Sequence, residues 1–174
     1  MIMSRMEKTI NAIVAGLHEH TGADVVPTNT ADRRPGYPYI SYNITSSLNA
    51  KTFSRVDEVI PSTTPGFDYD VKVIRKEQPY FMLSISAYSE NEAEAYDLAE
   101  KARDWFTFHG DLYFVALNIV AVNASNITDR TQQIVDDFER RYGFDVRIRA
   151  ARATVKRVEG VEGHRFNSTI NRPD

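Results

Sequence analysis

The chain has 174 residues, a formal net charge of −3 and a hydrophobic fraction of 42%. The length and hydrophobic content are sufficient for a substantial core, and the small negative charge argues against global electrostatic attraction to nucleic acid or anionic membranes. The absence of cysteine excludes disulfides, thiolate catalysis and zinc–thiolate sites. No apolar run has the length of a signal peptide or a membrane span, so we expect no membrane association.

The first predicted element is a helix that ends near Gly22. Ser4 and Glu7 have the spacing of a capping box at its start. The apolar residues that follow recur at the spacing of one helical face and are Met6, Ile10, Ile13, Val14 and Leu17. This pattern predicts an amphipathic helix with one face in the core.

A short strand, a loop and a longer strand are predicted next. Val25 and Val26 indicate the short strand, which Pro27 would end. Residues 28–38 carry two prolines and two adjacent arginines, which is typical of a loop. Residues 39–48 then alternate between apolar and polar side chains, which predicts a strand with one buried face.

Residues 49–66 are predicted to form a long loop, because prolines, serines and threonines interrupt the pattern. Loops of this length inside a compact domain are often functional or mobile. The segment carries a small apolar patch, which could either fold back onto the core or order against a partner. The residues assigned to a subunit or partner interface are Phe53, Arg55, Val56, Val59 and Ile60.

The alternation over residues 67–73 predicts another half-buried strand. Glu77-Gln78-Pro79 indicates a tight reversal into a further alternating run, residues 80–87. We therefore expect these two runs to form an antiparallel hairpin.

The segment from Pro79 to Val122 predicts strand, capped helix, strand. Ser89 precedes Glu92 by three residues, as in a capping box, and Gly110 stands where a left-handed helix terminus favours glycine. The helical stripe between them consists of Ala95, Leu98, Ala99, Ala102, Trp105 and Phe106. The apolar run 112–122 would be the second strand, and the helix would cross over the sheet between the two.

Residues 138–148 alternate over a long run and predict a final strand, bulged at Gly143. Ile134, Val135 and Phe138 also fit a helical turn, so the start of this strand stays open. Together the elements predict an α+β fold with a mixed, mainly antiparallel sheet, packed by the N-terminal helix and the central crossover helix. We expect a single domain over residues 1–158 and a flexible C-terminal tail over residues 159–174.

Asp57, Asp70 and Lys72 form the pattern that most resembles a catalytic site. Two carboxylates and a lysine near one strand can hold a divalent cation and activate water, as in metal-dependent nucleases. The same residues are also what the solvent face of a half-buried strand should contain, and this second interpretation is favoured. No catalytic set, metal site or cofactor is therefore expected.

Basic residues cluster on the predicted final strand. The cluster could be a solvated face paired with neighbouring carboxylates, a surface that touches passing phosphates, or a surface that meets an acidic partner subunit. The candidates to face DNA or a ring lumen are Arg147, Arg149, Arg152 and Lys156.

Three stretches of the sequence resemble the tail-terminator proteins of tailed phages, in particular the neck-terminator group. They are Pro38–Tyr42, Ala87–Ser89 and Arg140–Val146, and the last of these, with its Arg-x-x-Gly-Phe-Asp-Val pattern, is the most specific. The similarity extends roughly from Met6 to Val158. It implies a small α+β protein that assembles as a hexameric ring, caps the tail tube, terminates its polymerisation and joins the tail to the head-side connector.

The implied partners are further copies of the chain, the tail tube protein and the head–tail connector or stopper protein. Sheath protein would join them in a contractile tail, and genomic DNA would pass nearby. The implied location is the neck of the virion, and the host cytoplasm during assembly. Two alternatives remain, a head-completion or stopper component and the metal-dependent nuclease.

Overall fold

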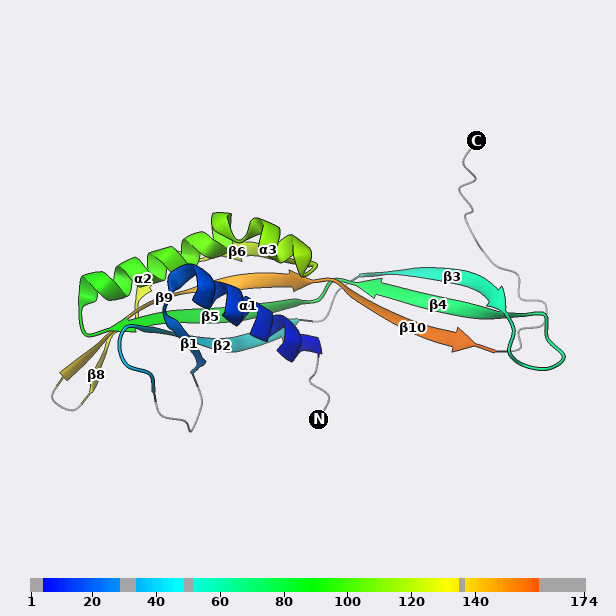
Figure 1. The fold of residues 1–174 in the computed structure, drawn as a ribbon, viewed down its shortest axis with the longest axis horizontal. Coiled ribbons are helices and arrows are strands. Elements are labelled where there is room, and N and C mark those ends of the chain that lie inside the picture. The colour runs from blue at the N-terminus through cyan, green and yellow to red at the C-terminus, as the bar shows by residue number, and fades with distance from the viewer. Residues whose placement is uncertain (1–4, 29–33, 49–51, 135–136, 160–174) are drawn as a thin grey trace. The chain divides into compact units, whose positions relative to one another are not determined.

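A computed structural model describes residues 5–28, 34–48, 52–134 and 137–159 (Figure 1). These residues belong to two compact units. The large unit comprises the described parts of Met1–Lys51 and Gln78–Ala151, and the small unit those of Thr52–Glu77 and Arg152–Asp174. The predicted α+β class is confirmed, with mostly antiparallel sheets and helices packed on one of them. Of the predicted C-terminal tail, only Glu159 lies within the described residues.

The large unit contains a sheet in the order β1-β2-β5-β9-β6, in which only β1 and β2 are parallel. Two further short strands, β7 and β8, pair with β9 after β6 has left it. The strands are β1 (Asp24–Pro27), β2 (Tyr39–Leu48), β5 (Tyr80–Ser89), β6 (Ile119–Ala124), β7 (Thr128–Asp129), β8 (Gln132–Ile134) and β9 (Asp137–Ala150). The start of β9, left open by the sequence, is thus extended backbone from Asp137 onward.

Helices cover one face of this sheet. They are α1 (Arg5–Thr21), α2 (Glu92–Asp104), the π-helix η1 (Trp105–His109) and α3 (Asp111–Ala116). The predicted apolar stripes of α1 and α2 are confirmed as core. Ile13 and Leu17 of α1 are buried in one cluster with Ala99 and Ala102 of α2. Each buried Leu or Ile side chain stabilises the fold by about 1.5–3 kcal/mol relative to an exposed one.

The connection from β5 through α2 to β6 differs in one respect from the prediction. Both strands pair antiparallel with β9, so they run parallel to each other with β9 between them. The helix therefore is a crossover, but between strands that are not neighbours. The chain returns after β8 to fill the intervening position with β9, a long-range pairing that local sequence does not show.

The predicted cap of α2 at Ser89 is wrong. Asn91 is the N-cap residue, and its Oδ1 accepts hydrogen bonds from the backbone N–H groups of Ala93 (2.9 Å) and Glu94 (3.3 Å). Ser89 instead accepts from the N–H of Asn91 (3.0 Å) and donates to the Glu94 carboxylate. Asn at least equals Ser as an N-cap, and here the backbone of Asn91 has the extended geometry that a cap requires.

The predicted helix end at Gly110 and the strand over residues 112–122 are also corrected. Gly110 has φ −87°, so it is not left-handed; glycine is needed because a Cβ would lie 2.7 Å from the carbonyl oxygen of Trp105. The chain continues into α3, which ends at Ala116 and is followed by the left-handed residue Asn118 (φ 55°). Only the second half of the apolar run forms a strand, β6. An apolar run of this length does not by itself distinguish a helix from a strand.

The small unit is a three-stranded antiparallel sheet in the order β10-β4-β3. Its strands are β3 (Phe53–Pro61), β4 (Tyr69–Glu77) and β10 (Arg152–Val158). The predicted long loop over residues 49–66 is therefore wrong, because nine of those residues form β3. Side chains of β3 are exposed on both faces of the sheet, so the strand lacks the amphipathic alternation by which it could have been recognised. Pro61 stands at the end of an edge strand, where its missing N–H is tolerated.

The predicted hairpin between residues 67–73 and 80–87 is also wrong, because the two strands belong to different sheets. The partners of β4 are β3 and β10 in the small unit, whereas β5 pairs with β2 and β9 in the large unit. Gln78 and Pro79 thus link two sheets rather than two neighbouring strands. The hairpin of this region joins β3 to β4 instead.

Gly143 in the middle of β9 is not a bulge, because the pairing of β5 with β9 runs from Tyr80–Arg149 to Ser89–Arg140 without a register shift. A Cβ at this position would lie 2.4 Å from the carbonyl oxygen of Ile85 and 2.9 Å from Nη1 of Arg130. The glycine is therefore required by close approach of a strand and a side chain.

The substitution Gly143→Ala is expected to destabilise the protein by about 2 kcal/mol or more, because backbone or Arg130 must shift to admit the methyl group. Urea unfolding followed by circular dichroism measures the change. Gly36→Ala is the matched control, since a Cβ there meets no atom within 4 Å, and it should change stability by less than about 0.5 kcal/mol. Equal effects of the two substitutions would contradict the steric explanation.

Two histidines link α1 to the π-helix. The ring centroids of His20 and His109 are 5.2 Å apart. Burial, and then the proximity of His109 and Lys101, lower the pKa of His20 below its ordinary value, against a weaker opposite effect of Asp104. As the pH falls, the unfolded chain therefore binds a proton at His20 at a higher pH than the folded protein does.

Stability is accordingly expected to decrease as the pH falls through the unfolded-state histidine pKa of about 6.5, until the pH lies below the folded-state value. His20→Gln should make the melting temperature less dependent on pH between 7.5 and 5.5 than in the unmodified protein. Thermal melts at both pH values measure the difference. A pH dependence unchanged by His20→Gln would show that this pair is not its source.

Candidate partner interfaces

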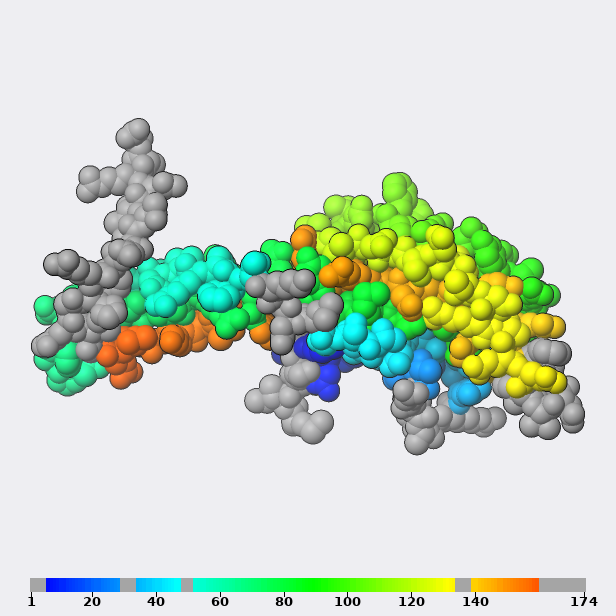
Figure 2. All heavy atoms as spheres, turned by 180° about the vertical axis from the view of Figure 1, so that it is seen from behind, coloured from blue at the N-terminus to red at the C-terminus, as the bar shows by residue number. Residues whose placement is uncertain are grey.

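No helix of the described residues lies on the face of the large sheet opposite the helices, and Figure 2 shows β2, β5, β9 and the segment 120–134 at this surface. Side chains alternate along each strand, so the residues between the buried ones point to this side. We call it the open face and define it by five cross-strand pairs of β5 and β9: Tyr80–Arg149, Met82–Arg147, Ser84–Asp145, Ser86–Gly143 and Tyr88–Arg141.

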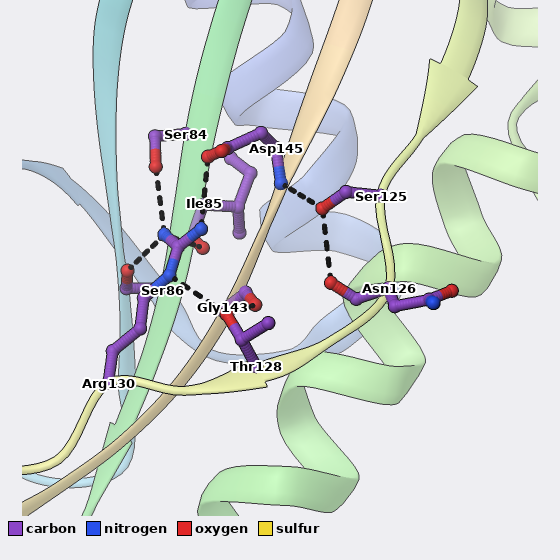
Figure 3. A network of polar contacts seen from close by, with 9 residues as sticks. All are labelled: Ser84, Ile85, Ser86, Ser125, Asn126, Thr128, Arg130, Gly143 and Asp145. Carbon is purple, nitrogen blue, oxygen red and sulfur yellow. Dashed lines mark hydrogen bonds and ion pairs between the residues drawn. The ribbon is translucent and has the colours of Figure 1, made fainter.

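Arg130, which follows β7, lies across the middle of the open face (Figure 3). Its Nη1 donates to the hydroxyls of Ser84 (2.8 Å) and Ser86 (3.3 Å), and its Nη2 to the carboxylate of Asp145 (3.0 Å). To reach β5, the guanidinium passes over β9 at Gly143, whose missing side chain leaves the space. The glycine of the Arg140–Val146 motif thus has a defined structural role.

Sequence reasoning missed Arg130, although the sequence contains part of the signal for its binding position. Gly143 and Asp145 share a face of one strand, and together they predict a gap beside an acidic group. Arg130 itself belongs to a separate polar segment, residues 123–131, and no local pattern determines where that segment lies. That segment is further held by Ser125, which exchanges hydrogen bonds with the backbone of Asp145 at 2.8 and 3.0 Å.

The rest of the open face is aromatic and basic. The guanidinium of Arg147 lies 4.3 Å from the ring centroid of Tyr80, a cation–π contact. At the other end, Tyr88 stacks on Tyr39 with 4.7 Å between centroids, and burial raises the pKa of Tyr39 to about 12. Neither Arg147 nor Arg149 has an ion-pair partner among the described residues.

The five residues predicted to form an interface lie on β3, an edge strand of the small unit. Phe53 and Val59 are 58% and 59% exposed, Val56 is also exposed, and Ile60 is half-buried. The register places Phe53, Arg55 and Val59 on one face of the sheet and the other two residues on the opposite face. The side of β3 away from β4 pairs with no strand in the described part of the chain.

The four basic residues predicted to face DNA do not lie on one strand. Arg147 and Arg149 belong to β9 in the large unit, whereas Arg152 and Lys156 belong to β10 in the small unit. Arg152 forms an ion pair with the buried carboxylate of Glu77, so its charge is compensated.

The structure does not bring the three residues of the nuclease hypothesis together. Asp57 and Asp70 point to opposite faces of the small sheet, and Lys72 pairs with Glu58 at 2.7 Å. Asp70 is completely buried and accepts hydrogen bonds from Ser62 Oγ (2.7 Å) and Arg157 Nε (2.6 Å). Within the described residues, no three His, Asp or Glu side chains are placed to hold a metal ion.

The helical side of the large unit presents two exposed features that sequence reasoning did not separate from the core. Trp105 and Phe106 are buried as predicted, but Phe108 of the same π-helix is 72% exposed. Leu112 and Val115 of α3 are 86% and 70% exposed. The wide turn of a π-helix changes the helical spacing, so a stripe that is apolar in sequence divides into a buried and an exposed part.

Comparison with known proteins places this chain in a family. A family model described as "phage neck terminator protein" matches residues 5–169. The chain therefore belongs to the phage neck terminator family, which confirms the resemblance found in the sequence. No curated protein sequence matches the chain. No helix of the described residues is long and apolar enough to cross a membrane.

The buried position of Asp70 predicts a role in holding the small unit together. Asp70→Asn removes the charge that Arg157 compensates and should destabilise this sheet by about 2 kcal/mol. Hydrogen exchange should accelerate in β3, β4 and β10. The exposed Asp68 provides the control, since Asp68→Asn should leave exchange unchanged. Unaltered exchange in Asp70→Asn would show that the ion pair contributes nothing to the sheet.

Proposed function

We propose that this protein is a structural component that caps the finished tail tube, terminates its polymerisation and joins the tail to the head-side connector. The observation that carries the proposal is the match of the family model to residues 5–169. The proposed role is structural rather than enzymatic, and it requires a closed assembly of several copies around the path of the genome. We expect this assembly to be a hexameric ring.

The small unit supports this role. Its edge strand β3 carries exposed apolar side chains and a row of backbone groups that can pair with another chain. Exposed apolar residues on an edge strand are costly for an isolated monomer and become favourable in an assembly. We propose that β3 contacts a neighbouring subunit or the tube protein. Of the two predicted basic residues on β10, Lys156 is a candidate to face DNA.

Light scattering across a concentration series, first without and then with tube protein, tests the proposal. A ring, formed alone or only with tube protein, together with shorter tubes in electron micrographs, is the expected result. A monomer that ignores tube protein and leaves tube length unchanged would contradict it. Binding to connector protein with no binding to tube protein would favour a head-side stopper instead.

The exposed Val59 offers a test of the β3 contact. Val59→Glu places a charge on the apolar edge strand and should weaken capping of the tube at least about tenfold, without changing the melting temperature. Tube length at varying protein concentration measures the effect. Thr154→Glu adds the same charge to the same sheet face on β10 and should cap normally. Normal capping by both variants would exclude Val59 from the interface.

A further inference from the structure

The outer surface of α2 carries an acidic stripe. Asp97, Glu100 and Asp104 are exposed and spaced by three and four residues, so they share one helical face. None of them forms an ion pair with another described residue. The cations Lys101 and Arg103 of the same helix donate instead to the carbonyl oxygens of Thr21 (3.0 Å) and Ser125 (2.9 Å).

The acidic stripe is followed along the chain by the exposed apolar residues Phe108, Leu112 and Val115. We call these six residues together the helical ridge. A surface that combines a row of carboxylates with large exposed apolar side chains is suited to a partner that offers cations beside apolar area.

The open face of the same unit offers that combination. Arg147 and Arg149 lie there without acidic partners among the described residues, beside Tyr80 and Met82. The register of β6 adds Val120, which lies opposite Arg149 and is also exposed. The two surfaces thus match in charge and in apolar content, and they belong to opposite layers of one two-layer unit.

We propose that the helical ridge of one copy docks on the open face of the next copy in the assembly. The inference rests on the proposed ring and names the surfaces that would build it. Two ridges meeting each other would bring carboxylates together, and two open faces would bring arginines together, so contacts between identical surfaces are disfavoured. The favoured contact joins two different surfaces, and such contacts close into rings where the rotation between copies permits.

Charge reversal on each surface provides the test. The double substitution Arg147→Glu/Arg149→Glu and the double substitution Asp97→Lys/Glu100→Lys should each raise the concentration for half-maximal ring formation at least about tenfold. A chain carrying all four substitutions should recover most of the loss, because the attraction is restored with the signs exchanged. Light scattering measures ring formation, with tube protein present if the unmodified protein requires it.

Lys8→Glu and Glu19→Lys, at exposed positions of α1, are the controls for charge alone and should assemble normally. Thermal melting of every variant establishes that it is folded. Mixing the two charge-reversed proteins gives a sharper test, because each retains one intact surface. The mixture should recover closed rings in which the two proteins alternate, because one contact is unmodified and the other has both charges exchanged.

Three results would overturn the proposal. Rings that tolerate both double substitutions would exclude this contact while leaving the proposed function in place. Loss of rings in only one of the two double-substituted proteins, without recovery in the fourfold variant, would show that the helical ridge and the open face do not contact each other. Intact rings with weakened DNA binding by Arg147→Glu/Arg149→Glu would assign the open face to the genome. An unmodified protein that never assembles would instead contradict the proposed function itself.

Discussion

The unshifted pairing of β5 with β9 is the interaction on which the large unit depends. This single register places Phe144, Val146 and Ile148 under the helices and, by alternation, Arg147 and Arg149 on the opposite side. A slip of one residue would exchange the two sets, exposing the core and burying the arginines. The stability of the unit and the chemistry of its open face are thus fixed by the same hydrogen bonds.

The small unit is stabilised in a different way. Two of its three strands, β3 and β10, carry mainly exposed side chains, and the described apolar burial is confined to Val71 and Val73 of β4, so a sheet of this size is marginal without support. Its central strand instead carries two buried carboxylates, Asp70 and Glu77, each paired with an arginine of β10. Breaking such a pair leaves a buried charge without compensation, so the pairs specify which strands meet.

These features fit the proposed role as a subunit of an assembly. Family membership assigns the chain to the phage neck. An open basic sheet face, an acidic and apolar ridge and an edge strand with exposed apolar residues are three surfaces of different character, and a ring that also contacts a tube needs several such surfaces. The proposed docking follows from this difference between surfaces, whereas the proposed function rests on the family match.

The sequence by itself determined the elements whose pattern is local. The stripe of α1, its end at Gly22 with φ 75°, the alternation of β2, β5 and β9 and the α+β class all follow from spacing within one segment. The three stretches Pro38–Tyr42, Ala87–Ser89 and Arg140–Val146 together indicated the family. In each case a residue's burial depends on neighbours three or four positions away, or two in a strand, which the sequence displays directly.

Only the tertiary structure decided which strands pair. β3 was hidden because both its faces are exposed, and β4 was assigned to the wrong partner because proximity in sequence favoured β5. The insertion of β9 between β5 and β6, and the passage of Arg130 over Gly143, join segments far apart in the chain. Long-range hydrogen bonds and ion pairs set these arrangements, and their free energy depends on contacts that no single segment contains.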